Sequence, residues 1–456
     1  MHVHILGIAG TFMGGIAAIA KAAGYRVTGS DLNVYPPMST QLTALGIDFS
    51  QGYGAEQLDL KPDVVVVGNA LSRGSPVVEA MLDRNMAYTS GPLWLADQVL
   101  KGRHVLAVAG THGKTTTSSM LAWILQYAGL EPGFLIGGMP KNFDATARLG
   151  GSRYFVIEAD EYDTAFFDKR AKFVHYRPRT VILNNLEYDH ADIYPDVASI
   201  RRQFNQLLRT VPGTGRLIVN GDDAELATTL GLGCWTPCEM FSAAAAGQWT
   251  ARDDTGESAQ FSVLLRGERV ADVAWSLLGK HNVMNALAAI AAAVHVGVTP
   301  SVAARALREF QGVKRRMEVR GVVGGVTVYD DFAHHPTAIE STLKGLRSRV
   351  GGARIVAVVE PRSNTMKLGV HREQLAPALT LADRSWLLKT PELGWDLTSA
   401  VASLGARVGF ADSVDALVEH LAEEARPGDH LLVMSNGGFG GLHGKLLGAL
   451  RARCGP

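Results

Sequence analysis

Residues 105–117 read V-L-A-V-A-G-T-H-G-K-T-T-T, and this stretch decides the fold that we expect for the chain. The apolar run at 105–109 predicts a buried strand, and the pattern at 118–128 predicts a helix. The glycines between them allow the backbone to turn so that several N–H groups face one anion, and the positive end of the helix adds to the field. This layout predicts a phosphate-binding loop in an α/β domain.

The loop departs from the common pattern G-x-x-x-x-G-K-[ST], because Val108 stands at the first glycine position. Lys114 would reach the β- and γ-phosphates of a nucleoside triphosphate, and the Thr115 hydroxyl would reach a Mg²⁺ ion. The alternative is a glycine-rich turn with a surface lysine. We favour an ATP site, formed by Gly110, Thr111, His112, Gly113, Lys114, Thr115 and Thr116.

The composition fits an α/β protein of about three domains, at roughly 150 residues each. Of the 456 residues, 47% are hydrophobic, 19% are charged and 50 are glycine. Lysine plus arginine and aspartate plus glutamate number 44 each, so no overall charge favours nucleic acid or an anionic membrane.

Targeting segments and disulfides are not expected either. The apolar N-terminal stretch has no basic leading segment and is divided by glycines, which argues against a signal peptide. No apolar run of about 18 residues predicts a membrane span. The three cysteines, Cys234, Cys238 and Cys454, form neither a disulfide framework nor a four-ligand zinc pattern. We expect Cys234 and Cys238 to be two free thiols in a reducing cytosol.

Three short strands, at 4–6, 25–29 and 64–67, predict a small nucleotide-binding domain in the first part of the chain. The loop after the first strand, G-I-A-G-T-F-M-G-G, resembles a dinucleotide-binding fingerprint, but Ala9 and Phe12 occupy two of its glycine positions. Asp31 follows the second strand. It either accepts a hydrogen bond from a ribose hydroxyl or caps a turn, and the sequence leaves both open.

Three apolar runs after the phosphate loop, at 154–157, 181–183 and 217–219, predict buried parallel strands. A weaker fourth strand is expected at 261–265. The carboxyl ends of parallel strands lie along one edge of a sheet, so Glu158 and His190 are expected beside the triphosphate, where carboxylate oxygen suits Mg²⁺. The other acids at these ends could be ligands, solvated loop residues or helix caps: Asp160, Glu161, Glu187, Asp222 and Asp223.

The remainder of the chain predicts a long helix, a link and a third domain. Asn282 and Asn285 share one face at the start of an alanine-rich helix, where they could bind a base or, for Asn282, cap the helix. The basic stretch 310–321 predicts a domain link with solvated charges. Further strands, which predict a third α/β domain, are expected at 326–329, 355–359, 385–388 and 430–434.

We therefore predict an α/β fold of three domains that reuse one strand–loop–helix plan. The expected division is a Rossmann-like N-terminal domain at 1–100, a central P-loop ATPase domain at 101–317 and a Rossmann-like C-terminal domain at 318–456.

Six motifs occur in the order in which the Mur ligase family carries them: G-T-H-G-K-T-T-T, E-A-D-E, N-N-L-E-Y-D-H-A-D, H-N-V-M-N-A, K-R-R-M-E and D-D-F-A-H-H-P-T. The whole chain thus resembles the Mur ligases, ATP-dependent enzymes that form amide bonds in peptidoglycan metabolism. The resemblance implies ATP and Mg²⁺ as cofactors, small-molecule substrates and a location in the bacterial cytoplasm. It implies neither nucleic acid nor a membrane as a partner. It also implies that the chain is a monomer or a weak homo-oligomer.

The resemblance also assigns roles to individual residues. Those that would catalyse the reaction are Lys114, Glu158 and His190, and those that would bind the metal are Thr115, Glu158 and His190. Asn282 and Asn285 would face the adenine, while Arg316 would reach the phosphates and Asp331, with His334 or His335, would contact the nucleoside. The first domain would hold UDP through Gly7, Gly10, Thr11, Met13, Gly14, Asp31 and Asn69.

Three stretches resemble the peptidoglycan-recycling branch of the family, at 33–42 (N-V-Y-P-P-M-S-T-Q-L), 360–369 (E-P-R-S-N-T-M-K-L-G) and 435–441 (S-N-G-G-F-G-G). That branch joins UDP-N-acetylmuramate to the tripeptide L-alanyl-γ-D-glutamyl-meso-diaminopimelate. Arg362 and Asn364 are the candidates to bind the peptide carboxylates, since arginine suits bidentate recognition, although a loop arginine is often simply solvated. The opening glycine loop and the D-H and D-D-F-A-H-H-P runs resemble instead the branch that adds free L-alanine, which is the alternative function.

The resemblance implies that the lactyl carboxylate attacks the γ-phosphorus of ATP, and that the incoming amine then attacks the acyl phosphate. Several family members carry a carbamylated lysine about fifteen residues after the D-H motif, but residues 201–206 read R-R-Q-F-N-Q here, so the ligands of a second metal stay undefined. Two other classes are disfavoured. A hydrolytic P-loop NTPase leaves the N-terminal nucleotide domain unexplained, and the altered fingerprint argues against a nicotinamide oxidoreductase.

Overall fold

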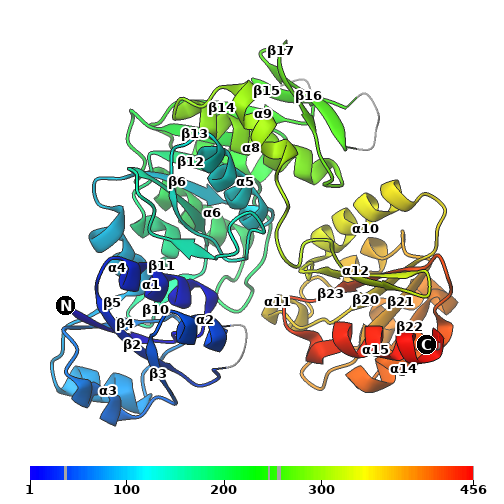
Figure 1. Cartoon of the computed structure of the whole chain (residues 1–456), viewed down its shortest axis with the longest axis horizontal. Coiled ribbons are helices and arrows are strands. Elements are labelled where there is room, and N and C mark those ends of the chain that lie inside the picture. Colours follow the sequence, from blue (N-terminus) through cyan, green and yellow to red (C-terminus); the bar gives the residue numbers. More distant parts are fainter. Residues whose placement is uncertain (35–37, 245–246, 254–257, 455–456) are drawn as a thin grey trace.

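The computed structural model describes residues 1–34, 38–244, 247–253 and 258–454, and it contains three α/β domains (Figure 1). The predicted three-domain α/β architecture is confirmed, while the domain limits at 100/101 and 317/318 stay predictions. Residues 35–37 of the stretch 33–42 and the side chain of Cys454 lie outside the described residues. None of the described helices is long and apolar enough to cross a membrane.

The first domain is a five-stranded parallel sheet with the order β3-β2-β1-β4-β5. Its strands are β1 (His2–Leu6), β2 (Arg26–Asp31), β3 (Asp48–Gln51), β4 (Val64–Val67) and β5 (Tyr88–Ser90). Its helices are α1 (Thr11–Ala22), α2 (Met38–Ala44), η1 (Ala55–Leu60), α3 (Pro76–Asp83), α4 (Gly91–Leu95) and η2 (Ala96–Leu100). The predicted strands are β1, β2 and β4. The two short edge strands lack a buried apolar run, which is why the pattern did not predict them.

The central domain carries a ten-stranded sheet with the order β17-β16-β15-β14-β13-β12-β6-β9-β7-β8. Its strands are β6 (His104–Ala109), β7 (Gly133–Leu135), β8 (Ala147–Arg148), β9 (Tyr154–Ala159), β12 (Thr180–Leu183), β13 (Arg216–Asn220), β14 (Cys238–Ser242), β15 (Trp249–Arg252), β16 (Gln260–Leu265) and β17 (Glu268–Ala274). A separate hairpin pairs β10 (Asp163–Ala165) with β11 (Asp168–Ala171). The helices are α5 (Lys114–Tyr127), η3 (Lys172–His175), α6 (Val197–Leu208), α7 (Ala224–Gly231), α8 (Lys280–His295) and α9 (Pro300–Arg308).

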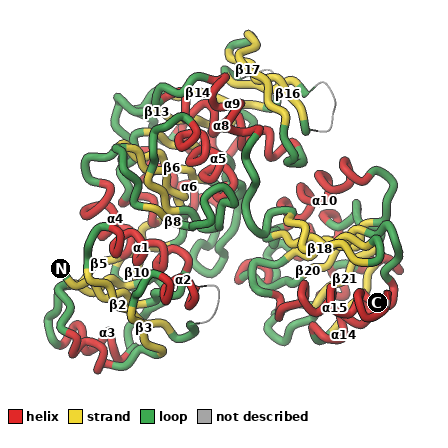
Figure 2. Tube along the Cα trace, viewed as in Figure 1, coloured by secondary structure: helices red, strands yellow, loops and turns green. Residues whose placement is uncertain are grey.

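The pairing in the central sheet confirms the predicted parallel strands. Strands β9, β6, β12 and β13 are parallel neighbours, so their carboxyl ends meet at one edge. Strands β15, β16 and β17 are antiparallel and extend the sheet at the end far from the first domain (Figure 2). This extension was expected only as a single weak strand.

The third domain has a six-stranded sheet with the order β18-β19-β23-β20-β21-β22. Its strands are β18 (Glu318–Val323), β19 (Val326–Asp331), β20 (Ile355–Val359), β21 (Arg384–Leu388), β22 (Val408–Ala411) and β23 (His430–Met434). Its helices are α10 (Pro336–Val350), α11 (Asn364–Lys367), α12 (Arg372–Ala378), α13 (Leu397–Ala400), η4 (Ala402–Arg407), α14 (Val414–Glu424), η5 (Phe439–Gly441) and α15 (Leu442–Cys454). Apart from β18, the strands pair in parallel.

The first two domains share an apolar core, whereas the third has its own. One cluster of buried side chains runs from Ile16 in α1 to Val105 and Leu135 in the central sheet. At Gly15 a Cβ atom would stand 2.3 Å from Leu135 Cδ1, so the helix can approach β7 only with glycine there. The two apolar clusters of the third domain contain only residues that follow the domain link. The third domain is therefore the part that can move as a unit.

The link itself is ordered against the third domain, which corrects the expectation of a solvated charge cluster. The Arg315 guanidinium donates to the carbonyls of Ser435, at 2.8 Å, and Gly437. Both Arg315 and Arg316 lie over the ring of Phe332, at 5.2 and 5.1 Å from its centre.

The predicted free thiols are present at Cys234 and Cys238, whose sulfur atoms lie 3.5 Å apart. Burial raises the pKa of Cys238 to about 12, so this thiol stays protonated at neutral pH.

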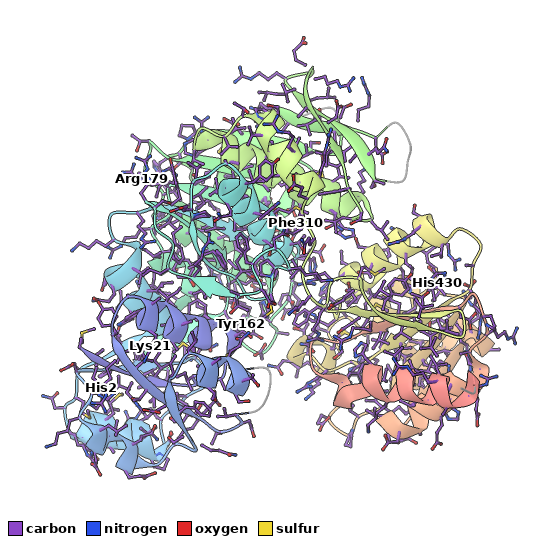
Figure 3. The ribbon with its side chains drawn as sticks, in the orientation of Figure 1. His2, Lys21, Tyr162, Arg179, Phe310 and His430 are labelled. Carbon is purple, nitrogen blue, oxygen red and sulfur yellow. The ribbon has the colours of Figure 1, made fainter. Side chains whose placement is uncertain are left out.

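A threonine hydroxyl bridges two histidine rings at the start of the central sheet. Thr180 Oγ1 lies 2.9 Å from His104 Nε2 and 2.7 Å from His295 Nδ1. One hydroxyl can donate to one ring and accept from the other when both rings are neutral. Burial lowers the pKa of His104 to about 4 and also lowers that of His295. A second bridge of this kind joins His2, Thr28 and His4 in the first domain, where Figure 3 labels His2.

These neutral pairs predict a loss of stability in acid. The folded-state pKa of His104 lies below the value of about 6.5 for an unfolded chain, so the unfolded state binds the proton first and stability falls as the pH drops from 6.5 towards 4. The variant His104→Gln has no imidazole at this position and should lose less stability as the pH drops. Between pH 7.5 and 5 we expect its melting temperature to fall by about 2–4 °C less than that of the wild type, as for roughly 1 kcal/mol. Calorimetric melting at pH 7.5, 6 and 5 tests this. Equal slopes for the two proteins would contradict it.

Candidate active site

The phosphate-binding layout predicted from residues 105–117 is present, with β6 entering the loop and α5 beginning at Lys114. Gly110 and Gly113 have φ angles of +145° and +79°. A Cβ at Gly110 would lie 2.9 Å from Asn184 Cβ, and one at Gly113 would lie 2.6 Å from Asn285 Oδ1. The loop therefore needs glycine at both positions, because a side chain would meet Asn184 after β12 or Asn285 in α8.

The Lys114 ammonium is held by two acceptors at the foot of the loop. Its Nζ donates to Glu161 Oε2 at 2.8 Å and to the Gly110 carbonyl at 2.7 Å. Burial alone would lower the pKa of Lys114, but the carboxylates of Glu161, Asp160 and Glu158 raise it, so the amine is charged. These three acids lie at or just after the end of β9, and their negative charge allows the ammonium to be buried.

Thr115 and Glu158 form a pair that fits a hard cation. Thr115 Oγ1 donates to Glu158 Oε1 at 2.9 Å, and the other carboxylate oxygen accepts from the Gly137 amide at 2.7 Å. Neighbouring oxygens around an octahedral Mg²⁺ ion, at about 2.1 Å from it, lie roughly 3 Å apart. Burial raises the pKa of Glu158 despite the nearby Lys114 charge, so a second cation would favour the carboxylate form.

His190 joins this group through Glu161, one of the acids that the sequence left undecided. His190 Nε2 lies 3.1 Å from Glu161 Oε1, and the ligand atoms of Asp160, Glu161 and His190 lie within 4.8 Å of one another. Glu161 is only 1% exposed, so it is neither a solvated loop acid nor a helix cap. The E-A-D-E motif contained this signal, but only the tertiary structure shows which acids point inward.

The remaining undecided acids have different positions. Asp223 caps α7 by accepting from the Leu226 amide at 2.8 Å. Asp222 accepts from the Ser242 hydroxyl and from the Ala243 amide, and thus orders a loop. Glu187 instead points into the site.

Asn282 and Asn285 line the first turns of α8 next to the phosphate loop. The helix cap is Gly279, and Asn282 donates to the Leu278 carbonyl at 2.7 Å, so the helix-cap alternative for Asn282 is wrong. Asn285 is buried and lies 3.4 Å from Asn184 Nδ2 behind Gly113. Asn184 also donates to Thr117 Oγ1 at 3.0 Å. The side-chain amides of Asn184 and Asn285 thus connect the end of β12 and the start of α8 to the phosphate loop and α5.

The third domain supplies side chains to the phosphate loop. His112 Nε2 lies 3.1 Å from Glu187 Oε2, and the His112 and His335 rings have centres 4.8 Å apart. Thr337 Oγ1 donates to the same Glu187 oxygen at 2.8 Å. The His112 and Thr337 hydrogen bonds, with the His335 and His112 charges, lower the pKa of Glu187 to about 2 although burial opposes this. His335 is thus brought to the predicted ATP site.

Asp331 is engaged by its own domain. Its carboxylate accepts from the amides of Met317 and Ala333, both at 2.8 Å, so it fixes the end of the link to the loop after β19. His334 faces the carbonyl of Phe332, at 2.9 Å. A contact of Asp331 with a nucleoside stays a prediction.

Thr365, which the sequence analysis did not single out, connects the third domain to the D-H motif. Its hydroxyl donates to Asp189 Oδ1 at 2.6 Å and accepts from the Ala191 amide at 3.3 Å. The same Asp189 oxygen accepts from the His190 amide at 2.8 Å. The segment that carries His190 is thus held by α11, which lies on the side of the third domain that faces the other two (Figure 1).

The two candidate peptide-binding residues differ in environment. Asn364 donates to Asp192 Oδ2 at 2.9 Å, so its amide lies in the contact between domains. Arg362 is exposed, and a Cβ at Gly437 would stand 2.0 Å from its Nη1 atom. The stretches 360–369 and 435–441 therefore lie side by side, as the Glu360–Ser435 hydrogen bond also requires.

A cavity of about 260 Å³ opens at the carboxyl ends of β1, β2 and β4. It is lined by Gly7, Gly10, Thr11, Met13, Asp31 and Asn69 from the predicted set, together with Phe12, Tyr53, Gly68, Ala70, Pro92, Thr164 and Lys172. Gly14, which the sequence also predicted for this site, does not line the cavity. A Cβ at Gly14 would lie 2.6 Å from Met38 Sδ, so this glycine allows Met38 to pack against α1. Asp31 accepts from the Ala9 amide at 3.0 Å, which supports the turn-capping alternative.

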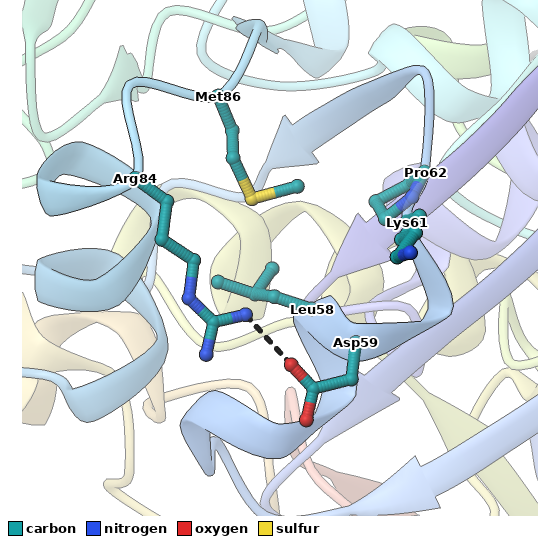
Figure 4. Close-up of a pocket in the computed structure, with 6 residues that line it drawn as sticks. All are labelled: Leu58, Asp59, Lys61, Pro62, Arg84 and Met86. Atoms are coloured by element: carbon teal, nitrogen blue, oxygen red, sulfur yellow. Dashed lines mark hydrogen bonds and ion pairs between the residues drawn. The ribbon is translucent and has the colours of Figure 1, made fainter.

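A second hollow in the first domain, of about 450 Å³, lies away from the glycine loop. It is lined by Leu58, Asp59, Lys61, Pro62, Arg84 and Met86 (Figure 4). Its Arg84–Asp59 ion pair, at 2.8 Å, is exposed to solvent, so it contributes little to the stability of the fold.

A phosphate loop, an adjacent carboxylate–histidine cluster and three α/β domains define a family, and comparison with known proteins identifies it. The chain belongs to the Mur ligase family. Its catalytic-domain model matches residues 2–103, the Mur ligase middle domain matches 108–293, and the glutamate ligase domain of Mur ligases matches 315–437.

Relatives that cover nearly the whole chain include two kinds of ligase. The UDP-N-acetylmuramate–L-alanyl-γ-D-glutamyl-meso-2,6-diaminoheptandioate ligase of Escherichia coli (strain K12) is 56% identical over 99% of this chain and 98% of its own length. A crystal structure of a murein peptide ligase from Psychrobacter arcticus 273-4 is 48% identical, with a TM-score of 0.78 over 99% of this chain and 98% of that one. The UDP-N-acetylmuramate–L-alanine ligase of Oleidesulfovibrio alaskensis is 33% identical over 95% of this chain and 96% of its own.

The Thr365 contact predicts the dynamics of the D-H segment. Thr365→Val keeps the side-chain volume but removes a hydroxyl bonded to a carboxylate, a loss of about 1.5–3 kcal/mol. We expect the amides of residues 188–192 to exchange with deuterium about ten times faster or more. The matched control is Thr380→Val, which removes an exposed hydroxyl that donates to the Pro377 carbonyl. Unchanged protection of 188–192 in Thr365→Val would show that the contact does not hold the segment.

Proposed function

We propose that the chain joins UDP-N-acetylmuramate to L-alanyl-γ-D-glutamyl-meso-diaminopimelate by an amide bond, with ATP converted to ADP and phosphate. One observation carries the proposal. A phosphate loop and a separate loop-lined cavity in another domain are connected through the Asp160–Lys172 ion pair, at 3.0 Å, and the adjacent Glu161. A ligase that activates a sugar nucleotide needs both pockets, whereas a hydrolytic NTPase needs one.

The choice of acceptor rests on similarity along the whole chain. The tripeptide-adding relative is 56% identical and the alanine-adding relative 33% identical. The stretches 360–369 and 435–441 lie together in the third domain, which fits one shared specificity surface. Addition of free L-alanine is the alternative, and the glycine loop at 7–15 and the D-H motif fit both.

In the proposed ATP site, the loop residues Gly110–Thr116 enclose the phosphates, with the Lys114 ammonium against the β- and γ-phosphates. Asn282 and Asn285 face the adenine from α8, while Arg316, Asp331 and His335 approach from the third domain. Lys114 is now paired with Glu161 and Gly110, and the phosphates would replace these contacts.

Mg²⁺ would be held by Thr115, Glu158 and His190, with Glu161 beside them. When bound, it would offset the repulsion between the triphosphate and an approaching carboxylate. The oxygen-rich pair of Thr115 and Glu158 supports this assignment, since hard oxygen ligands suit Mg²⁺.

The chemistry then follows from position. The lactyl carboxylate oxygen attacks the γ-phosphorus, the bond to the β-γ bridging oxygen breaks, and ADP leaves. The alanyl amine attacks the acyl carbonyl, loses a proton and expels phosphate. Lys114 and Arg316 stabilise the charge on the transferring group. Arg362 and Asn364 bind the peptide carboxylates, and closure of the third domain brings the amine to the acyl phosphate.

We further propose the domain division 1–100, 101–317 and 318–456, and a bacterial cytoplasmic location where ATP and sugar nucleotides are available. The partners would be the small-molecule substrates, with neither nucleic acid nor membrane, and the chain would be a monomer or weak homo-oligomer.

The deciding experiment is phosphate release with ATP, Mg²⁺ and UDP-N-acetylmuramate, in which L-alanine is compared with the tripeptide. We expect turnover with the tripeptide and little with alanine. Turnover with alanine alone would transfer the chain to the alanine-adding function, and ATP hydrolysis that does not depend on the sugar nucleotide would support an NTPase.

Lys114→Ala should lower the rate of phosphate release at least ~100-fold, because removal of one preorganised charge typically costs about 3 kcal/mol of barrier. Lys101→Ala, at an exposed lysine before β6, is the control and should keep the wild-type rate. Near-normal turnover in Lys114→Ala would refute the ATP-site assignment.

A further inference from the structure

The cavity of the first domain is completed by two residues of the second. Most of its wall comes from the glycine loop at the start of α1 and from the ends of β2 and β4. Thr164 and Lys172 enter from the β10–β11 hairpin and from η3 of the central domain. Among the described residues that line the cavity, Lys172 is the only basic one.

Lys172 is buried but lies next to the phosphate-type loop of the first domain. The residue is 8% exposed, and its Nζ lies 5.4 Å from the ring centre of Phe12 and 5.6 Å from that of Tyr162. Phe12 follows Thr11, the first residue of α1. Tyr162 is labelled in Figure 3, where it lies at the border of the first two domains.

The bonding of Lys172 leaves room for an anion. An ammonium has three donors, and the structure shows one side-chain hydrogen bond, to Asp160 Oδ2 at 3.0 Å. The backbone amide of Lys172 donates to the Tyr162 carbonyl at 2.9 Å, which fixes the residue at the cavity wall. Lys172 therefore lines the cavity in addition to pairing with Asp160, and its two other donors are available to an anion in the cavity.

Asp160 is shared with the catalytic side of the molecule. Its carboxylate lies within 4.8 Å of the ligand atoms of Glu161 and His190. The Asp160 carboxylate thus lies between the Lys172 ammonium at the cavity and the Glu161 and His190 side chains beside the phosphate loop.

We propose that Lys172 binds the diphosphate of the UDP-sugar across the domain boundary and thereby completes a binding site that the first domain alone cannot form. The inference rests on the proposed function, because it takes a UDP-sugar as the occupant. The helix N-terminus at Thr11 and the Lys172 ammonium both line the cavity, and both would attract the diphosphate. Through Asp160, binding of the sugar nucleotide is coupled to the residues beside the phosphate loop.

The test is calorimetric binding of UDP, UDP-N-acetylmuramate and uridine to the full chain without ATP. Lys172→Met should weaken binding of UDP and of UDP-N-acetylmuramate by the same factor, about tenfold or more. Uridine, which has no phosphate, should bind both proteins equally. Lys169→Met is the matched control. Lys169 lies three residues earlier, is 69% exposed and pairs with Asp163, so its loss should not change UDP affinity.

Lys172→Arg guards against a folding defect, since it keeps the charge and should retain most of the UDP affinity while Lys172→Met loses it. Wild-type UDP affinity in Lys172→Met would overturn the inference, as would a loss for UDP-N-acetylmuramate alone, which would place the contact at the sugar. Either result would leave the proposed function intact if the wild type ligates the tripeptide. A wild type that binds no UDP would overturn both.

Discussion

The buried carboxylate of Glu161 is the constraint on which the site depends. It is 1% exposed, and its two oxygens bind Lys114 at 2.8 Å and His190 at 3.1 Å. A buried charge is tolerated only when its hydrogen-bonding capacity is used. The phosphate loop, the end of β9 and the segment that carries Asp189 and His190 must therefore come together around the Glu161 carboxylate. Three segments that are distant in the sequence are thereby fixed relative to one another before any substrate arrives.

The segment after β12 carries this arrangement to the third domain. Residues 184–192 contact the phosphate loop through Asn184 and Glu187, and contact α11 through Asp189 and Asp192. Since one segment touches both, a displacement of the third domain changes the surroundings of His190. The polar nature of these contacts fits reversible closure better than a permanent apolar interface does.

The first two domains form the fixed part of the molecule. Their shared apolar core holds the cavity at the start of α1 at a constant distance from the phosphate loop. The third domain, whose apolar clusters are its own, contacts this fixed pair through polar side chains such as Thr365 and Asn364. Such a division suits a reaction in which an intermediate formed from one substrate stays bound until the second substrate reacts with it.

The sequence by itself determined the glycine loop at 110–113, the parallel strands that flank it and the edge of the sheet near which Glu158 and His190 lie, because periodicity and turn chemistry are local. It could not decide among the acids at that edge. Asp223 became a helix cap and Glu161 a buried partner of Lys114, since the direction of each side chain depends on segments that only folding brings near. Contacts between domains, such as that of Thr365 with Asp189, leave no periodic trace and were decided by the tertiary structure alone.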